Sequence, residues 1–531
     1  MQYLLRGTII ALLAAAPLHA QTPCVEGLAR VEGIGDFECS NVDLVGHVPV
    51  SAFATDGSPD PLRTNDVWGW TDPETGVEYA LVGTRNGVGF VDLSDPTAPR
   101  LVGKLPSAVQ PTANSTHRDV KVYRDVAYVV AELPLGMQVF DLTRLRGQTG
   151  PPVTFTEDVL YDRIGNAHNI AIDEASGFAY AVGAVYFAGE REALGLPAAC
   201  DVPGFHAIDI RDPLNPTFAT CFSDADRDPE PYSSAGYTHD AQCLTYAGPD
   251  ADYTGRQLCM GSNEDVVAIF DVTDKAAVRL VAQAAYPNAT YTHQGWFSED
   301  QRYFFVNDEI DEQADRNNGG DATQRTIVLD LLDLDEPEVA FIHDSGVRTV
   351  DHNQYARGGL LYQSNYEAGL RILDLSRVGD GVLTEVAYFD THILDDDLRY
   401  AGNWSNYPFL ESGLVLATDM RNGLFVLRVT RDVETAADRR PEAAGVALSE
   451  PMPNPATGDT RLSLRVRESQ RVRAALYDVG GRRLADVFDG AVGVGAEVRL
   501  QVPVQDLPAG VYVIRVTGET FEAARRLVVA R

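Results

Sequence analysis

The stretch GVGFVDLSDPTAPRLVGKLP, residues 87–106, joins two short apolar segments through a turn that contains two prolines. The first segment ends in an aspartate between apolar residues, FVDLS at 90–94, and this ending returns along the chain. The copies are VFDLT (139–143), AIDIR (207–211), IFDVT (269–273), VLDLL (328–332), ILDLS (372–376) and VLRVT (426–430), the last with Arg428 in place of the aspartate. Their central positions lie 44 to 68 residues apart, which is typical of a β-propeller blade of about four strands.

Each repeat contains short segments that alternate in twos or are rich in β-branched and aromatic residues, and no long amphipathic helix is evident before residue 430. The seventh repeat, 401–430, ends after its third strand. LVGHVP at 44–49 matches LVGKLP at 101–106, the outer strand of the first repeat. The sequence therefore predicts an all-β, seven-bladed β-propeller over 21–430, closed by an N-terminal strand that covers an otherwise open edge.

The two ends of the chain differ from this repeat. Arg6 and the apolar run GTIIALLAAAP at 7–17 predict a signal peptide over 1–20, and no later segment has the length and apolarity of a transmembrane helix. The chain carries a net charge of −34, but residues 449–531 hold 12 Arg and 10 acidic residues. This change predicts a linker over 431–448 and a separate small β domain over 449–531. The overall acidity argues against nucleic acid as a partner.

Six cysteines fall in sequence as the pairs 24 and 39, 200 and 221, 243 and 259. Export favours disulfides, and no pair has the short spacing of a zinc site. Cys243 and Cys259 lie on predicted neighbouring strands of one hairpin, which suits a cross-strand bridge. The spacing leaves the connectivity open.

A histidine stands at the start of the first strand in five of the repeats. The five are His117, His168, His239, His293 and His352. Acids and amides end the second strands: Glu132, Asn263, Glu264, Asn307, Asp308, Glu309, Asn365 and Asp419. In a propeller these two positions meet on one face near the central channel, so we expect a polar site there.

Imidazoles and carboxylates together are suited to a divalent metal, calcium or a transition metal. The metal-ligand candidates are His117, His168, His239, His293, His352, Glu132, Glu264, Asp308 and Glu309, although five histidines of one ring cannot all reach one ion. Further ligand-binding candidates are Trp70, Trp404, Asn263, Asn365 and Asp419. Alternatively, one histidine per blade is an architectural feature of the repeat.

Two other features allow more than one interpretation. Trp68, Trp70, Trp296 and Trp404 are candidates for a carbohydrate or peptide platform, with core packing as the alternative. The acidic segment 307–321 suits a lid, a calcium loop or a disordered loop.

Two hypotheses of function follow. The first is a binding or scaffold module with its ligand on the face that carries the histidines. The second is a metal-dependent hydrolase or lyase, with Glu132, Glu264, Asp308 or Glu309 as the general base. Binding is favoured over catalysis because no set of nucleophile, base and ligands stands out, so the catalytic residues remain unknown and the ligand could be a protein, a peptide or a glycan.

Two family resemblances add to this interpretation. PMPNPATGDTRLSL (451–464), ALYDVGGRRLADV (475–487) and LPAGVYVIRVTGETFEAARRLVV (507–529) resemble the type A sorting domain of type IX secretion. This resemblance implies a small β-sandwich that is recognised by the type IX machinery, with release or attachment at the outer cell surface.

VWGWTDPETGVEYALVGTRNGVGFVDLSDPTAP (67–99) and GNWSNYPF (402–409) look like the choice-of-anchor B family of LVIVD-repeat propellers. That resemblance covers roughly residues 24–430 and implies a propeller whose anchor varies between members. It implies no activity and no catalytic residues.

Overall fold

The structure is a computed structural model with two compact units, Met1–Arg431 and Asp432–Arg531. In the first unit it describes residues 21–31, 34–54, 62–110, 117–186, 189–224, 236–394 and 397–430. In the second it describes 446–448, 456, 460–466, 468–478, 482–494, 496, 498–504, 507–508, 510–518 and 521–529. The predicted signal peptide and residues 431–445 of the predicted linker lie outside the described residues. Each unit is considered by itself.

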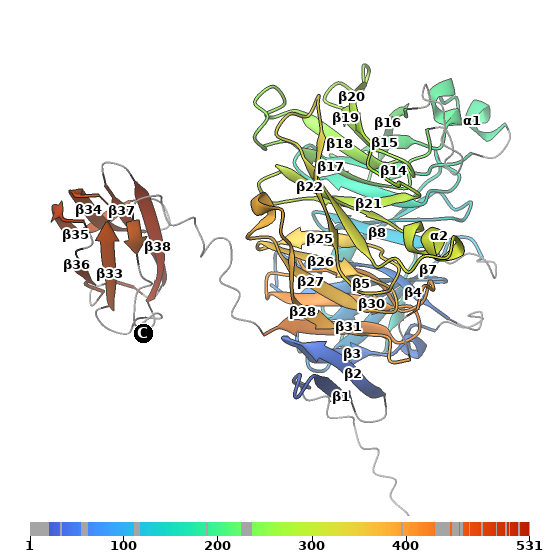
Figure 1. The fold of residues 1–531 in the computed structure, drawn as a ribbon. Helices are drawn as coiled ribbons and strands as arrows, with labels where there is room; N and C mark the ends of the chain where they lie inside the picture. The colour runs from blue at the N-terminus through green and yellow to red at the C-terminus, as the bar shows by residue number, and fades with distance from the viewer. Residues whose placement is uncertain are drawn as a thin grey trace, which may run out of the picture. The chain divides into compact units, whose positions relative to one another are not determined.

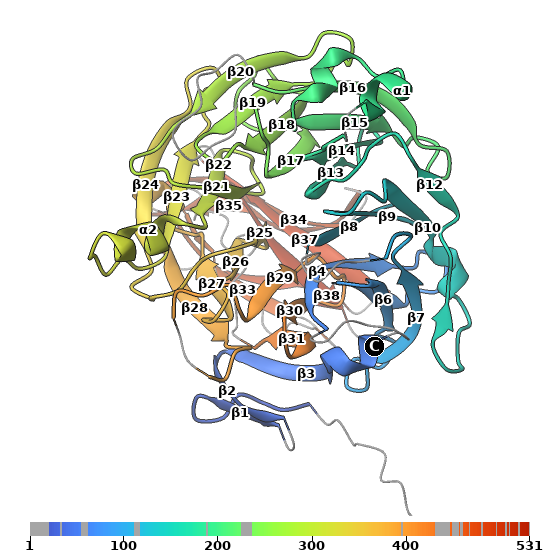
Figure 2. The same cartoon turned by 90° about the vertical axis from the view of Figure 1, so that its right-hand side faces the viewer.

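The described part of the first unit forms seven antiparallel sheets, most of them four-stranded and arranged as in a propeller (Figures 1 and 2). From the inner strand outward, sheet one is β4 (Thr64–Thr71), β5 (Glu78–Thr84), β6 (Gly87–Asp92) and β7 (Arg100–Pro106), with β11 (Val153–Thr154) added in parallel. Sheet two is β8 (Arg118–Tyr123), β9 (Val126–Ala131), β10 (Met137–Asp141) and β12 (Val159–Tyr161). Sheet three is β13 (Asn169–Asp173), β14 (Phe178–Val182), β15 (Phe205–Asp209) and β16 (Thr217–Phe222).

The next three sheets repeat the same order. Sheet four is β17 (Asp240–Thr245), β18 (Gln257–Ser262), β19 (Val267–Asp271) and β20 (Arg279–Ala284). Sheet five is β21 (Thr292–Phe297), β22 (Tyr303–Asp308), β23 (Arg325–Asp330) and β24 (Glu338–Asp344). Sheet six is β25 (Gln354–Arg357), β26 (Leu360–Ser364), β27 (Leu370–Asp374) and β28 (Thr384–Phe389), extended by the hairpin of β2 (Gly35–Ser40) and β1 (Leu28–Val31).

Sheet seven combines both ends of the first unit. Its strands are β29 (Asn403–Tyr407), β30 (Leu414–Asp419), β31 (Gly423–Val429) and the N-terminal β3 (Val42–Val48). β3 pairs antiparallel with β31, from Val42 opposite Val429 to Val48 opposite Leu424. This is the pairing expected from the match between the two LVG segments. The inner strands β4, β8, β13, β17, β21, β25 and β29 contact one another in order, and β29 contacts β4, as Figure 2 shows.

Helical segments in the described residues are short. They are α1 (Glu190–Ala193), α2 (Asp311–Asn317) and the 3-10 turns η1 (Val50–Phe53), η2 (Leu142–Leu145), η3 (Ala198–Asp201) and η4 (Val378–Asp380). The acidic segment 307–321, whose sequence suits a lid, a calcium loop or a disordered loop, contains the end of β22 and the helix α2.

The repeated aspartate has a structural role in every sheet where it occurs. At the end of each third strand, one carboxylate oxygen accepts the backbone N–H of the residue two positions later, at 2.7–3.1 Å. Such Asx turns stabilise the chain reversal into the fourth strand. The motif that defines the repeat is therefore an architectural one.

The core lies between neighbouring sheets. The second strands are buried almost throughout, as in VAYVVA of β9, because each is covered on both faces. Phe90 of sheet one, for example, packs on Phe140 of sheet two with ring centroids 4.9 Å apart. The three disulfides are Cys24–Cys39, Cys200–Cys221 and Cys243–Cys259. The expectation of disulfides is confirmed, the connectivity that the spacing left open joins neighbours in the sequence, and the last bridge lies across β17 and β18.

The second unit contains two antiparallel sheets. One consists of β32 (Val446–Leu448), β33 (Thr460–Val466) and β36 (Val498–Val502). The other consists of β35 (Arg483–Val492), β34 (Gln470–Asp478), β37 (Gly510–Thr517) and β38 (Glu522–Val529). Leu464, Leu476, Ile514 and Leu527 from both sheets share one hydrophobic cluster. β32 falls at the end of the segment predicted as a linker.

Candidate functional site

Five histidines and one tryptophan form a closed circle at one end of the inner strands. The histidines stand at or just before the start of β8, β13, β17, β21 and β25, and the tryptophan is the second residue of β29. We call this set the histidine circle: His117, His168, His239, His293, His352 and Trp404. Successive ring centroids, beginning with the pair His117 and His168, are 5.1, 4.0, 4.3, 4.5, 4.8 and 5.1 Å apart. The repeat thus brings all five predicted histidines to one face.

Four of these histidines have the same ring nitrogen engaged. Glu132 accepts from Nδ1 of His117 at 2.8 Å and from Nδ1 of His168 at 2.7 Å. Nδ1 of His239 donates to the backbone oxygen of His293 at 3.0 Å, and Nδ1 of His352 donates to that of Trp404. Carbonyl and carboxylate oxygens accept hydrogen bonds, so Nδ1 carries the proton and Nε2 keeps a lone pair. This arrangement is the one found behind metal-binding histidines.

One acid and two histidines of the circle come together most closely. The Nε2 atoms of His293 and His352 each lie 3.8 Å from a carboxylate oxygen of Glu309. One ligand atom from each residue lies within 4.8 Å of the other two. Two ligands of a tetrahedral metal at its usual bond length lie about 3.4 Å apart, so small shifts would give three bonds. Tyr366 donates to Glu309 at 2.7 Å and fixes that carboxylate.

Burial and the neighbouring acid determine the charge of the circle. Burial lowers the pKa of His168 and of His352, to about 3 for the latter, and holds the pKa of His239 and His293 well below the usual range. Burial also opposes the charging of His117, but the hydrogen bond and charge of Glu132 outweigh it and raise its pKa. The circle is therefore mostly neutral at pH 7, and neutral imidazole is the form that binds metals.

Several predicted acids are used in local structure instead. Asp308 accepts from the backbone N–H groups of Thr290 and Tyr291, at 2.6 and 2.7 Å, and is 1% exposed. Asp419 accepts from the backbone N–H groups of Arg421 and Asn422, both at 2.8 Å. These two carboxylates stabilise turns and do not belong to the groups of potential ligand atoms found in the described residues.

The other candidates lie beside the circle or away from it. Glu264 has a left-handed backbone, with φ of 65°, and its side chain hydrogen-bonds Tyr291. Asn263 and Asn365 are buried at the ends of second strands. Trp70 stacks on Tyr79, with centroids 5.2 Å apart, in the core between sheets one and two. Trp70 therefore has the packing role that was the alternative for the tryptophans.

Two features of the site were not predicted. Tyr366 hydrogen-bonds Glu309 and Tyr291 hydrogen-bonds Glu264, two acids beside the histidine circle. The sequence signal for Tyr291 is its position two residues before His293. Inside the channel, Lys121 binds Asp66 at 3.1 Å and also Asp119. The charged residues Asp119 and Lys121 within the strand RDVKVY, next to buried Val120 and Val122, were the available signal for this buried network.

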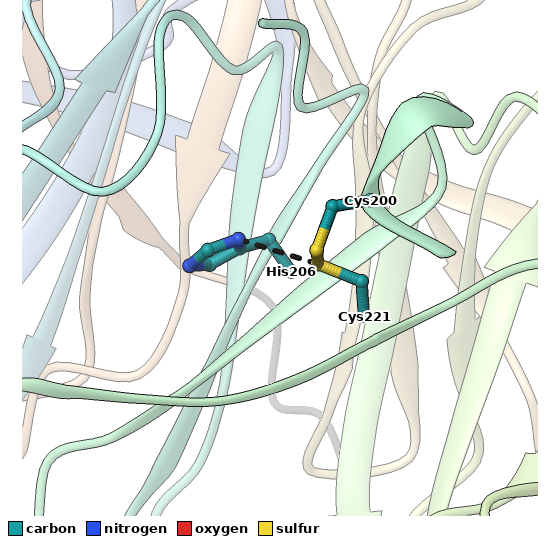
Figure 3. A group of neighbouring side chains, drawn as sticks. All are labelled: Cys200, His206 and Cys221. Carbon is teal, nitrogen blue, oxygen red and sulfur yellow. Dashed lines mark hydrogen bonds between the residues drawn. A yellow bond between two sulfur atoms is a disulfide. The ribbon is translucent and has the colours of Figure 1, made fainter. Parts of the chain in front are cut away.

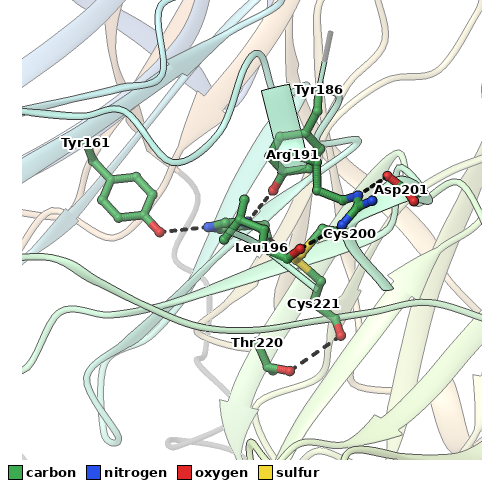
Figure 4. The surroundings of a disulfide bond; sticks show 9 residues. Tyr161, Tyr186, Arg191, Leu196, Cys200, Asp201, Thr220 and Cys221 are labelled. Carbon is green, nitrogen blue, oxygen red and sulfur yellow. Dashed lines mark hydrogen bonds and ion pairs between the residues drawn. A yellow bond between two sulfur atoms is a disulfide. The ribbon is translucent and has the colours of Figure 1, made fainter. Parts of the chain in front are cut away.

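A second group of potential ligands is closed by a disulfide. Cys200, His206 and Cys221 lie together (Figure 3), but their sulfurs are bonded to each other at 2.03 Å and are not thiolates. His206 is held between Tyr161, at 2.8 Å from Nε2, and Tyr186 (Figure 4). Burial lowers the pKa of His206 to about 3. This group stabilises sheet three and is not a metal site while the disulfide is intact.

Fold and sequence together define an all-β protein with a propeller-like first unit and a C-terminal targeting domain. Residues 452–530 match the model of the secretion system C-terminal sorting domain. This domain is recognised by the type IX secretion machinery and indicates secretion and attachment at the outer surface. Among the described residues, no helix has the length and apolarity needed to cross a membrane. No curated protein matches the sequence.

Solved structures resemble the chain at low identity. The extracellular domain of a one-component system from B. thetaiotaomicron has 10% identity and a TM-score of 0.40; the match covers 92% of this chain and 58% of that one. A protein from Lactobacillus plantarum has 14% identity and a TM-score of 0.40, with 83% and 99% covered. The β-propeller domain of Cps50 from Myceliophteria thermophila has 11% identity and a TM-score of 0.39, with 69% and 99% covered.

Proposed function

We propose that the protein is an exported, surface-attached binding module built as a closed seven-bladed β-propeller of the choice-of-anchor B type, followed by a β-sandwich sorting domain. A signal peptide over 1–20 takes it through the inner membrane. The succession of seven sheets, the pairing of β3 with β31 and the sorting domain support this proposal. Its ligand binds at the histidine circle with the help of a divalent metal.

The observation that carries the metal proposal is the close approach of His293, Glu309 and His352. Three neutral imidazoles, those of His168, His239 and His352, have Nδ1 tied to fixed acceptors, which orients the rings and leaves Nε2 as a ligand atom. His293, Glu309 and His352 supply two nitrogens and one oxygen within reach of one ion. Nitrogen ligands favour zinc, nickel, cobalt or copper over calcium or magnesium.

Three protein ligands leave a coordination position open for an external group. Trp404 and His117 are neighbours in the histidine circle, with ring centroids 5.1 Å apart. Their side chains supply further contacts to the external group. Glu132, with a side chain 38% exposed, presents a carboxylate beside His117 and His168 of the histidine circle. The site therefore suits a ligand that offers one donor atom to the metal and hydrogen-bond donors to the rim.

Metal analysis of the purified full chain tests the proposal. After dialysis against Zn²⁺ or Ni²⁺, we expect about one bound ion per chain, lost in His293→Ala and in Glu309→Gln. The matched control is His343→Ala, because His343 lies on the outer strand β24, away from the circle. A parent chain that takes up no metal, or circle variants that bind as much as the control, would contradict the proposal.

A further inference from the structure

The inner strands also border a second site, at their opposite ends. A cavity of about 500 Å³ is lined by residues from the C-terminal parts of the inner strands, including Lys121 of β8 and Trp296 of β21. The histidines stand at the N-terminal ends of the same strands, about 13 Å away over four residues. The volume lies within the range of small-molecule sites. We call it the aromatic cavity.

Aromatic side chains form one wall of the aromatic cavity. Trp68, Trp296, Tyr407 and Phe409 line it, and each remains partly exposed. Tyr407 lies 4.8 Å from Trp68 and 5.4 Å from Phe409, centroid to centroid, and Phe409 lies 6.0 Å from Trp296. Four aromatic rings from sheets one, five and seven thus border one space, which concentrates negative ring faces and apolar edges there.

Carboxylates dominate the charged groups around this space. Asp173 and Glu174 line the cavity. Deeper in the channel, Asp66 and Asp119 bind Lys121, whose ammonium lies 4.6 Å from the centroid of Trp68. Asp240 also acts on Lys121 electrostatically, and burial raises the pKa of Asp66 to about 8 and that of Asp240 to about 7. The acids that line the cavity itself are Asp173 and Glu174.

Two further cations lie near the cavity. Arg357 lies 6.0 Å from the ring of Phe409, at the edge of the aromatic wall. Lys275 acts on Asp173 electrostatically but donates to Gln257 and to the backbone oxygen of Val272, both at 2.6 Å. Among the residues that line the cavity, the acids Asp173 and Glu174 outnumber the single cation Lys121.

Several polar groups of the wall bind within the protein. Lys121 donates to Asp66 and Asp119. Thr245 donates to Asp173 at 3.1 Å, and the amide oxygen of Gln242 accepts from the backbone of Phe297 at 2.7 Å. The wall offers a ligand carboxylate oxygens and aromatic faces. These are the groups that bind a cation.

We propose that the aromatic cavity binds an organic cation, an ammonium or guanidinium group on a small apolar body. The cation lies against Trp68, Trp296 and Tyr407 and faces Asp173 and Glu174. Lys121 over Trp68 shows that this wall accepts an ammonium at contact distance. The cation is either a free amine or a basic side chain of a peptide, since both carry the same group. This site is independent of the proposed metal site.

Calorimetric titration of the full chain tests the proposal with choline, with a lysine-containing tripeptide and with 3,3-dimethylbutanol, the neutral isostere of choline. We expect a cationic probe to bind about tenfold more tightly than the alcohol. Binding of choline alone assigns a small free ammonium compound, and binding of the tripeptide alone assigns a peptide. No binding of either cation at millimolar concentration, or equal binding of choline and the alcohol, overturns the proposal.

Variants test whether the cation binds at the aromatic cavity. Trp296→Ala should weaken binding of the cation about tenfold, and Glu174→Gln should weaken it without a change in the melting temperature. Trp296→Phe keeps a ring and should retain most of the affinity, which separates loss of the site from loss of the fold. The matched control is Tyr388→Ala, because Tyr388 of the outer strand β28 also has a guanidinium over its ring, at 4.6 Å. Equal weakening by this control overturns the assignment to the cavity.

Discussion

Glu312 is a buried acid whose replacement by glutamine should stabilise the protein. It lies in α2, is 0% exposed, and neither of its carboxylate oxygens has a hydrogen-bond partner among the described residues. Burial, followed by the charges of Asp351 and Asp311, raises its pKa from 4.5 to about 12. At pH 7 the folded protein therefore holds a proton on Glu312 that the unfolded chain releases.

The size of the effect follows from proton linkage. A carboxyl with a raised pKa leaves stability unaffected below pH 4.5, and stability then falls by about 1.4 kcal/mol for each pH unit above it. At pH 7 the cost is about 3 kcal/mol. Glu312→Gln keeps the shape and needs no proton, so the variant should be more stable by up to about 3 kcal/mol at pH 7 and equal to the parent at pH 4.

Urea unfolding followed by tryptophan fluorescence measures this, because all four tryptophans lie in the first unit. Glu338→Gln, at an exposed position of β24, is the matched control and should change stability by less than about 0.5 kcal/mol. A gain that does not vary between pH 5 and 8 would refute the linkage argument. A destabilised Glu312→Gln that no longer responds to added Ca²⁺, while the parent does, would instead assign a cation to these carboxylates.

Three further predictions concern other parts of the molecule. Arg146 binds Asp72 through two nitrogens at 2.9 and 2.7 Å, which with other hydrogen bonds lowers the pKa of Asp72 to about 2. Asp72→Asn should cost about 1–2 kcal/mol at pH 7 by urea unfolding, and the difference should vanish as pH falls from 4 to 2. Replacing Cys243 and Cys259 by alanine should cost about 3 kcal/mol by the same assay, unless the loop between them stays ordered in the unfolded chain. Deleting residues 452–530 should leave the protein inside the outer membrane, as judged by surface labelling of intact cells, and continued labelling would show that another signal suffices.

The fold was predictable because the repeat records local chemistry. Asp92 and its counterparts recur because six of the seven sheets have the same Asx turn after the third strand. A turn that recurs in the fold places the same residue type at the same position of successive repeats, independently of the function. The pairing of β3 with β31 was predictable for the same reason. An outer strand from the other end of the chain pairs with a third strand as the outer strands of the other sheets do, so its sequence resembles theirs.

The site was predictable only up to the choice of face. The histidines reach one circle because a strand start has the same place in every sheet. The acids at the ends of the second strands do not all point the same way. Glu309 faces the histidine circle, whereas its neighbour Asp308 accepts a hydrogen bond from the backbone of Thr290. Side chains alternate along a strand, so a shift of one residue decides between site and support. Where a strand ends in an irregular turn, the spacing of residues in the sequence does not determine which of two adjacent side chains faces the site.

The two proposed sites share a preference for cations, and the charge of the chain affects how such ligands arrive. With the net charge of the whole chain at −34 and residues 449–531 slightly basic, the acidity belongs to the rest of the chain. Such a field attracts cations over distances of about the Debye length, roughly 8 Å at physiological salt. The rate of association of a cationic probe should therefore fall with added salt. The buried ligand atoms of His293 and His352 are screened much less, so metal already bound there should dissociate at nearly the same rate. If added salt slows the association of the cationic probe but leaves the dissociation rate of the bound metal unchanged, two effects are distinguished. The long-range field of the acidic surface then acts on association, and the local contacts of the sites determine dissociation.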